Sequence, residues 1–378
     1  MIVGSKLPHI GTSIFTQMTQ LANQHGAINL SQGFPNFAID QRLSDIVAKK
    51  VYENVHQYQP ASGNPMLLQK IAALLQTSYR RDVNPGTELL VTAGATQGIF
   101  TAIQALVSHG EEVVLLDPCY DSYETPILLA GGKPVHVRMR PDYSPDWPAI
   151  NNAVSSATRL IVINTPHNPS GRVWTESDFV ALEQLLDQHP NLLVLSDEVY
   201  EYIAFEQPHV SVHHRAKLRD RSLSVSSFGK SFHITGWKVG YMVAPEPIMA
   251  EIKKVHQFLV FSVNSVAQSA LAVYLDVVDV GALRAFYRQK RDDFAAMLSA
   301  TNLKLLPCEG TYFQLASFGH LSQESDVDFA QRLVVEYGVA AIPVSRFHTD
   351  GTDQRHIRFC FAKDNETLMA AAERLKKL

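Results

Sequence analysis

The chain has 378 residues, of which 46% are hydrophobic and 19% charged, as expected for a globular protein with a large core. Its 33 lysines and arginines against 37 aspartates and glutamates give a net charge of −4, which argues against a nucleic-acid-binding protein. No apolar run approaches the roughly 20 residues that span a bilayer, so we predict no membrane segment.

Cysteine and histidine usage favours a reduced intracellular protein without a metal site. Cys119, Cys308 and Cys360 show no C-x-x-C spacing, and the N-terminus lacks the charged head and continuous apolar stretch of a signal peptide. His213 and His214 have no cysteine or carboxylate at ligand spacing, and we expect them in a surface loop. We therefore predict a cytoplasmic location and no bound metal.

Short apolar runs recur through the middle of the chain, and each is followed by a longer amphipathic stretch. The runs lack polar alternation, which is typical of strands buried on both faces. The stretches 95–110 and 176–190 have helical spacing and end at Gly or Pro. This alternation predicts an α/β fold with a mostly parallel, doubly wound seven-stranded sheet. The predicted strands are 88–94, 111–118, 133–139, 159–166, 191–198, 222–227 and 237–244.

The alternation of apolar runs and amphipathic stretches ends near residue 275. A charged helix predicted at 282–298 is followed by a few apolar segments and a final helix. This pattern predicts a smaller C-terminal α/β domain. The first forty-odd residues are rich in turn formers, and we expect them to pack with that domain. The predicted division is an N-terminal segment 1–45, a large domain 46–275 and a small domain 276–378.

Small and amide-bearing residues stand at the ends of two predicted strands, where ligands bind in open parallel sheets. Gly94, Ala95 and Thr96 begin a predicted helix whose free amides could face a phosphate. Alternatively, these small residues only form a tight turn between strand and helix. Asn168, in "NTPHNPSG", has an amide free to donate a hydrogen bond, or it only completes a rigid turn.

Two charged residues lie in apolar surroundings. Asp197 directly follows a buried strand, where it either caps a helix or faces the protonated ring nitrogen of a pyridine cofactor. Tyr200, three residues later, could reach the same ligand. Arg358 lies in the apolar strand "HIRFCFA" and either pairs with a core carboxylate or clamps the carboxylate of a substrate.

The stretch "SSFGKS" leaves three interpretations of Lys230 open. The Gly-Lys-Ser ending resembles a phosphate-binding loop, but Ser224 stands where that motif requires glycine. A solvated loop lysine is the simplest alternative. A nucleophilic amine beside a carbonyl cofactor is the third, with Ser227 and Lys238 near enough in sequence to hold a phosphate group. Together, the five motifs describe a pyridoxal phosphate site.

Several blocks of the sequence resemble a known family. "SSFGKSFHITGWKVGY", "NTPHNPSG", "SDEVYE", "NLSQGFPNF" and "HIRFCFAKDNETL" are similar to the fold-type-I pyridoxal-phosphate aminotransferases of class I/II. The likeness covers nearly the whole chain and is strongest to the branch of methionine aminotransferase, kynurenine aminotransferase and glutamine transaminase K. "CEGTYF" and "YRQKRD" point toward the bacterial methionine type.

The resemblance implies pyridoxal 5′-phosphate as cofactor, with Lys230 as the Schiff-base lysine and Asp197 as the partner of the pyridine nitrogen. The same resemblance assigns further residues to the cofactor. These are Asn168 and Tyr200 at the ring hydroxyl, Tyr120 stacked on the ring, and Gly94, Ala95, Thr96, Ser227 and Lys238 around the phosphate.

The resemblance also implies a homodimer with shared sites, because Tyr58 matches a tyrosine that reaches the phosphate of the neighbouring subunit. It implies that Gly33, Asn168 and Arg358 receive the α-carboxylate of the substrate. The pocket for the substrate side chain is then formed by Ile14, Phe15 and Phe347 of the same subunit, together with Phe261 of the partner subunit.

The implied activity is transfer of the amino group of methionine, and of aromatic and other neutral amino acids, to a 2-oxo acid by a ping-pong mechanism. Lys238 stands where aspartate-type members carry arginine, so their dicarboxylate preference is not transferred. A carbon–sulfur β-lyase acting on cysteine conjugates and a kynurenine–oxoglutarate-type transaminase are the alternatives on the same fold.

Overall fold

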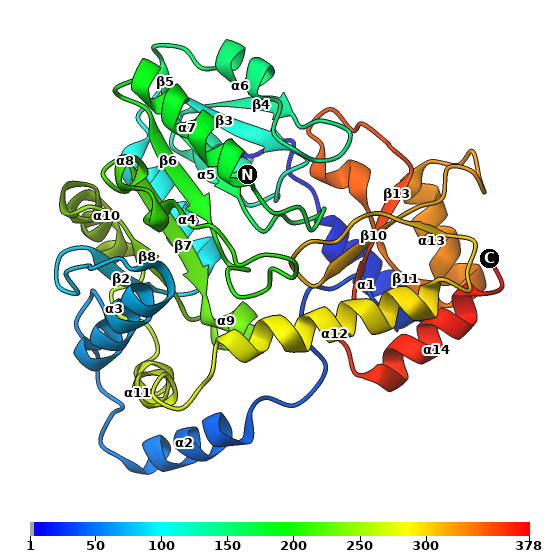
Figure 1. Ribbon diagram of the computed structural model, residues 1–378, viewed down its shortest axis with the longest axis horizontal. Helices are drawn as coiled ribbons and strands as arrows, with labels where there is room; N and C mark the ends of the chain where they lie inside the picture. The colour runs from blue at the N-terminus through cyan, green and yellow to red at the C-terminus, as the bar shows by residue number, and fades with distance from the viewer. Residues whose placement is uncertain (1–3) are drawn as a thin grey trace.

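The computed structural model describes residues 4–378, and a seven-stranded sheet forms the centre of its larger region, on the left in Figure 1. The strands pair in parallel except β8, which is antiparallel to both of its neighbours. The predicted α/β fold class is confirmed. In spatial order the strands are β2 (Leu89–Thr92), β8 (Gly240–Val243), β7 (Ser222–Ser227), β6 (Leu193–Asp197), β5 (Thr158–Asn164), β3 (Glu112–Asp117) and β4 (Lys133–Arg138).

Helices cover both faces of this sheet because successive strand residues point to opposite sides and both sides are apolar. In β3, Val113 and Leu115 pack on one face, and Val114 and Leu116 on the other. The first face is covered by α4 (Ala95–Leu106), α5 (Glu124–Leu129) and α10 (Glu246–Leu259). The second is covered by α3 (Pro65–Tyr79), α6 (Trp147–Ala153), α7 (Glu176–Gln188), α8 (Ala216–Arg219) and α11 (Ser265–Tyr274).

A smaller layered region holds the C-terminal part of the chain. Its antiparallel sheet has the order β12 (Ile342–Pro343), β13 (His356–Cys360), β10 (Phe313–Ser317) and β9 (Lys304–Leu305). Around it pack α12 (Gly281–Leu298), α13 (Asp326–Tyr337) and α14 (Asn365–Leu375). The long helix α12 begins below the end of β7 in Figure 1 and runs to α14, against which it packs.

The N-terminal segment joins the smaller region. β1 (Ile28–Asn29) pairs in parallel with β11 (Val339–Ala340), and α1 (Ile14–His25) packs against α13. The division into 1–45, 46–275 and 276–378 stays a prediction, and its first three residues lie outside the described chain. The boundary at residue 45 falls inside α2 (Gln41–Tyr52), which packs against α11.

Two local expectations differ from the structure. The strand predicted from residue 237 begins only at Gly240, because residues 235–237 form a 3₁₀ turn and Lys238 adopts a left-handed φ of 54°. The expected surface position of His213 is wrong: this side chain is buried, and its Nε2 lies 2.6 Å from the hydroxyl of Ser224. Only its neighbour His214 is exposed. No helix within residues 4–378 is long and apolar enough to cross a membrane.

Candidate active site

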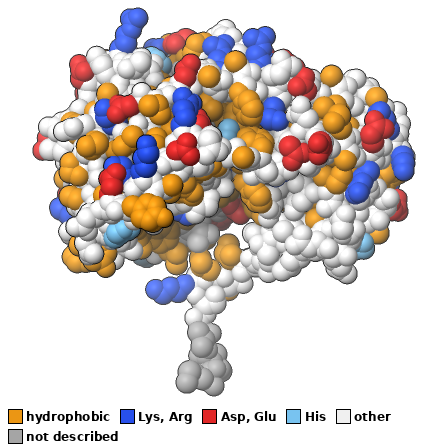
Figure 2. Space-filling model, turned by 90° about the horizontal axis from the view of Figure 1, so that it is seen from below, with side chains coloured by type: hydrophobic (Ala, Val, Ile, Leu, Met, Phe, Trp, Pro, Cys, Tyr) orange, Lys and Arg blue, Asp and Glu red, His pale blue; other side chains and the backbone are white. Residues whose placement is uncertain are grey.

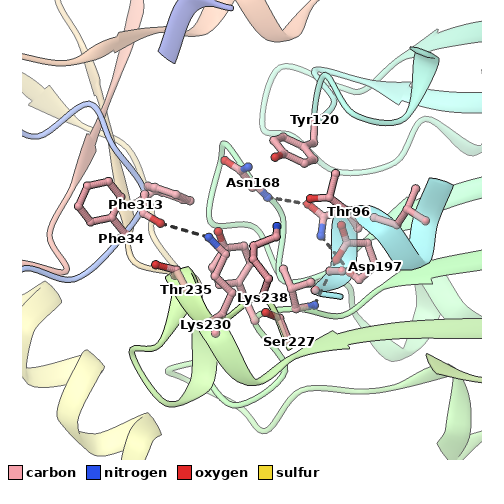
Figure 3. A pocket seen from close by; sticks show the side chains of 18 of the residues that line it. Phe34, Thr96, Tyr120, Asn168, Asp197, Ser227, Lys230, Thr235, Lys238 and Phe313 are labelled. Atoms are coloured by element: carbon pink, nitrogen blue, oxygen red, sulfur yellow. Dashed lines mark hydrogen bonds between the residues drawn. The ribbon is translucent and has the colours of Figure 1, made fainter. Parts of the chain in front are cut away.

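A cavity of about 320 Å³ opens where the strands β5, β6 and β7 end, and the smaller region closes its other side (Figure 3). Its volume lies within the usual range for small-molecule sites. Most of the residues predicted for the site line this cavity together. They are Phe15, Gly33, Gly94, Ala95, Thr96, Tyr120, Asn168, Asp197, Tyr200, Ser227, Lys230, Lys238 and Arg358.

Lys230 stands in the short helix α9 (Phe228–Ser231), directly after β7 ends. Its Nζ donates a hydrogen bond to the carbonyl of Gly33 at 3.1 Å, and the phenol of Tyr312 donates to the same oxygen at 2.7 Å. Burial lowers the pKa of the Lys230 ammonium to about 8, and the positive charges of Arg358 and Lys238 act in the same direction. About a tenth of this amine is therefore uncharged and nucleophilic at pH 7.

Asp197 ends β6 on the opposite side of the cavity (Figure 3). Its Oδ2 accepts a hydrogen bond from the phenol of Tyr123 at 2.6 Å, and its Oδ1 accepts from the backbone N–H of Val199 at 3.2 Å. Burial raises the pKa of this carboxyl to about 6, although both hydrogen bonds oppose the shift. No helix of the described chain begins beside Asp197, so the helix-cap interpretation is not supported.

The start of α4 has the features of an anion-binding helix terminus. No side chain among residues 4–378 caps its first turn, which leaves amides free at the positive end of the helix dipole. Gly94, which precedes the helix, has a φ of +79°, and a Cβ there would lie 3.2 Å from Nζ of Lys238. The absence of a side chain at Gly94 thus makes room for the ammonium group beside the free amides.

Arg358 is fully buried, yet no carboxylate in the described chain lies within 4.0 Å of its guanidinium. The guanidinium donates to Oδ1 of Asn168 and to the carbonyl of Ser31, and its Nε has no partner among residues 4–378. Its carbon lies 3.8 Å from the ring centroid of Phe313. Burial lowers the pKa of Arg358 to about 10, so the group stays charged at neutral pH. An uncompensated buried cation of this kind favours a bound anion.

Four predicted residues lie outside the cavity lining. Tyr58 is 79% exposed, and its ring packs edge-on against Phe261 at a centroid distance of 5.2 Å. Phe347 stands behind the site, 5.9 Å from the ring of Phe15 and 5.2 Å from the Arg358 guanidinium. Ile14 packs into the core of the smaller region.

Sequence reasoning missed several residues that line the cavity, among them Gln32, Phe34, Tyr123 and Phe313. Phe34 and Phe313 face the lysines from the side of the smaller region (Figure 3). Tyr123 stands three positions after Tyr120 in "DPCYDSYE", a spacing that places both rings on one side of a turn. Only that spacing could have identified it.

Comparison with known proteins gives the family. The family model for aminotransferase class I and II matches residues 25–375. Methionine aminotransferase from Escherichia coli (strain K12) is 49% identical over 382 residues, which cover 100% of this chain and 99% of that protein. The chain is a class I and II aminotransferase.

Other aminotransferases are also similar along the whole chain. The crystal structure of YbdL from Escherichia coli, described with a methionine aminotransferase function, matches with a TM-score of 0.97 at 49% identity over all of both chains. Kynurenine–oxoglutarate transaminase from Dictyostelium discoideum is 32% identical over 97% of this chain and 94% of that protein. This aminotransferase is therefore an enzyme of amino-group transfer, and its cavity is the candidate active site.

Proposed function

We propose that this aminotransferase uses pyridoxal 5′-phosphate and prefers methionine as the amino donor. The proposal rests on four groups that line a single cavity. They are the amine of Lys230 with its lowered pKa, the carboxylate of Asp197 without a cationic partner, the uncapped start of α4, and Arg358 without a carboxylate partner among the described residues. Each group would meet a different part of the cofactor or of an amino acid bound to it. The residues present therefore fit the cofactor.

Specific residues would hold each end of the cofactor. Lys230 would hold its aldehyde carbon, Asp197 its ring nitrogen, and the amides of Ala95 and Thr96 its phosphate, with Lys238 and Ser227. Tyr120 would cover the ring, and Asn168 and Tyr200 would meet the ring hydroxyl. When bound, pyridoxal phosphate supplies an electron sink for the bonds at the substrate Cα.

The protein residues control where the proton moves. The free Lys230 has a pKa suited to a general base, and it would take the proton from Cα of the substrate. Its Nζ lies 5.8 Å from the ring centroid of Tyr200 and 5.6 Å from that of Tyr312, so aromatic rings line the space around the amine. Arg358 orients the substrate by its α-carboxylate, which directs the Cα proton toward the lysine.

The walls of the cavity support a neutral donor. Phe15, Phe34 and Phe313 line its substrate side, and Arg358 is the only arginine among the lining residues of the described chain. A second carboxylate, as in aspartate, would be buried there without a guanidinium partner. A thioether packs well against aromatic ring edges. The 49% identity to a methionine aminotransferase supports the same preference.

The decisive assay compares kcat/KM for methionine, phenylalanine, kynurenine and aspartate with a common 2-oxo acid. We expect methionine to be best and aspartate poor, and a preference for aspartate would refute the pocket argument. Release of pyruvate and ammonia from cysteine conjugates without added 2-oxo acid would instead support the β-lyase alternative. Reduction of the loaded protein followed by peptide mapping should place the pyridoxyl group on Lys230.

We also propose a homodimer. Large apolar side chains at residues 51–66 and 258–261 are exposed, including Tyr52 at 92% and Phe258 at 88%. Figure 2 shows hydrophobic side chains gathered around a recess on one face. Tyr58 and Phe261 belong to this exposed set, and the proposed dimer would bring them to the site of the partner subunit. The three cysteines form no disulfide, which supports the cytoplasm as the proposed compartment.

A further inference from the structure

The carboxylate of Asp197 is held only by neutral donors. Tyr123 donates to Oδ2 at 2.6 Å, and the backbone N–H of Val199 donates to Oδ1 at 3.2 Å. No lysine, arginine or histidine nitrogen of residues 4–378 lies within 4.0 Å of it. The negative charge is therefore oriented but not neutralised, and it can still interact with a positive charge inside the cavity.

Tyr123 is itself rigidly placed. It is 2% exposed, and its ring meets that of Tyr120 edge-on at 5.8 Å and 82°. Its backbone N–H donates to the carbonyl of Tyr120 at 3.2 Å, and α5 begins at the next residue. The side chain of Tyr123 thus contacts both Asp197, at one end of the proposed cofactor position, and Tyr120, whose ring is predicted to cover the cofactor.

We propose that Tyr123 is a positioning residue for Asp197: its phenol aims the carboxylate at a protonated ring nitrogen and stabilises the carboxylate's negative charge. This inference rests on the proposed function, because only a pyridine cofactor supplies that ring nitrogen. Tyr123 has no assigned part in the family resemblance, and the inference comes from the 2.6 Å contact between two buried side chains.

The energetics favour this role. Burial raises the pKa of Asp197 to about 6, close to the range in which the carboxyl would protonate and lose its attraction for a ring N–H. The hydrogen bond from Tyr123 counteracts that shift because it is stronger to the carboxylate than to the neutral acid. Burial also raises the pKa of Tyr123 well above its ordinary value, so the phenol remains a donor at any working pH.

The test measures ligand binding to the full chain freed of cofactor. The probes are pyridoxal 5′-phosphate and its deaza analogue, in which a C–H replaces the ring nitrogen, and the readout is fluorescence quenching. Wild-type protein should bind the natural cofactor more tightly. Tyr123→Phe removes the phenol oxygen and should lower the affinity ratio of the two ligands about tenfold. The lost hydrogen bond to a charged group contributes a free energy that corresponds to about a factor of ten in binding.

Tyr143→Phe is the matched control, because Tyr143 is also buried but donates to Gln354, outside the cavity lining. This variant should keep the wild-type preference. Asp197→Asn should lose most of the preference, and Tyr123→Phe added to Asp197→Asn should change it no further, as expected if the tyrosine acts through the aspartate.

The outcomes separate this inference from the proposed function. A wild-type protein that binds both ligands equally would refute the role of Asp197 itself. A wild-type preference that survives in Tyr123→Phe would overturn only the inference about Tyr123. Equal weakening of both ligands in Tyr123→Phe would assign the tyrosine a purely structural role, and a further loss in the Asp197→Asn background would show that it acts elsewhere.

Discussion

Replacing Arg358 by Met should remove substrate binding while leaving the fold intact or more stable. Arg358 is buried without a carboxylate partner in the described chain, and three phenylalanine rings surround its guanidinium. Methionine is close in length and fits an apolar, aromatic environment. The substitution therefore removes the charge and its hydrogen bonds with little loss of packing.

The structure sets the size of both effects. The pKa of Arg358 falls from 12.5 to about 10 through burial, which corresponds to about 3 kcal/mol by which the charged group is disfavoured in the folded chain without ligand. A bound carboxylate recovers energy of this order, and truncating one partner of such a pair costs about 2–5 kcal/mol. We therefore expect kcat/KM to fall about 30- to 5,000-fold, mostly through KM.

The assay combines steady-state kinetics with methionine and thermal unfolding of the cofactor-free protein. The expected result is a large rise in KM and an unfolding midpoint that does not fall, because an uncompensated buried charge is gone. Arg288→Met is the control, since Arg288 is 52% exposed on α12 and makes only a 3.9 Å contact with Glu206. It should leave both kinetics and unfolding unchanged.

Two results would contradict this reasoning about Arg358. A loss confined to kcat, with KM unchanged, would mean that the guanidinium acts on the reacting atoms rather than on the substrate carboxylate. A clearly lower unfolding midpoint in Arg358→Met would mean that its hydrogen bonds to Asn168 and Ser31 outweigh the cost of burying the charge.

Three further predictions follow from the site. Because the free amine of Lys230 must react, capture of pyridoxal phosphate should quicken about tenfold per pH unit up to pH 8 and then level off in stopped-flow absorbance, whereas a pH-independent rate would contradict the lowered pKa. Gly94→Ala should weaken cofactor binding about tenfold, because the new Cβ approaches Lys238, and should destabilise the fold by about 1 kcal/mol, because φ at this position is +79°. Unaltered cofactor affinity in a fluorescence titration would count against the proposed anion site. Mixed subunits carrying Tyr58→Ala and Lys230→Ala should regain activity at one site per dimer, and inactive heterodimers would exclude the shared site.

The sequence predicted the sheet and the polar ends of its strands well, because continuous apolar runs such as 191–198 are a local signal. Asp197 ends one such run and Lys230 lies three residues after another, and the structure places both in the cavity. Tyr123 escaped prediction because its contact joins a turn to the last residue of β6, Asp197, which is 74 residues away in the sequence. His213 was misplaced for a related reason: its hydroxyl partner, Ser224, lies on a strand 11 residues later, and composition alone does not reveal it.

The position of β2 has a consequence for the order in which the chain folds. β2 is the first strand of the large sheet to be synthesised, yet it lies at the sheet edge and pairs only with β8, the last. Leu89, Leu90 and Val91 are fully buried in the finished protein, and the strand they pair with, residues 240–243, leaves the ribosome after all the other strands of the sheet. Since α4 follows β2 and carries the proposed anion site, this end of the cavity should be completed late. Truncated nascent chains should therefore expose this strand and recruit chaperones until β8 appears.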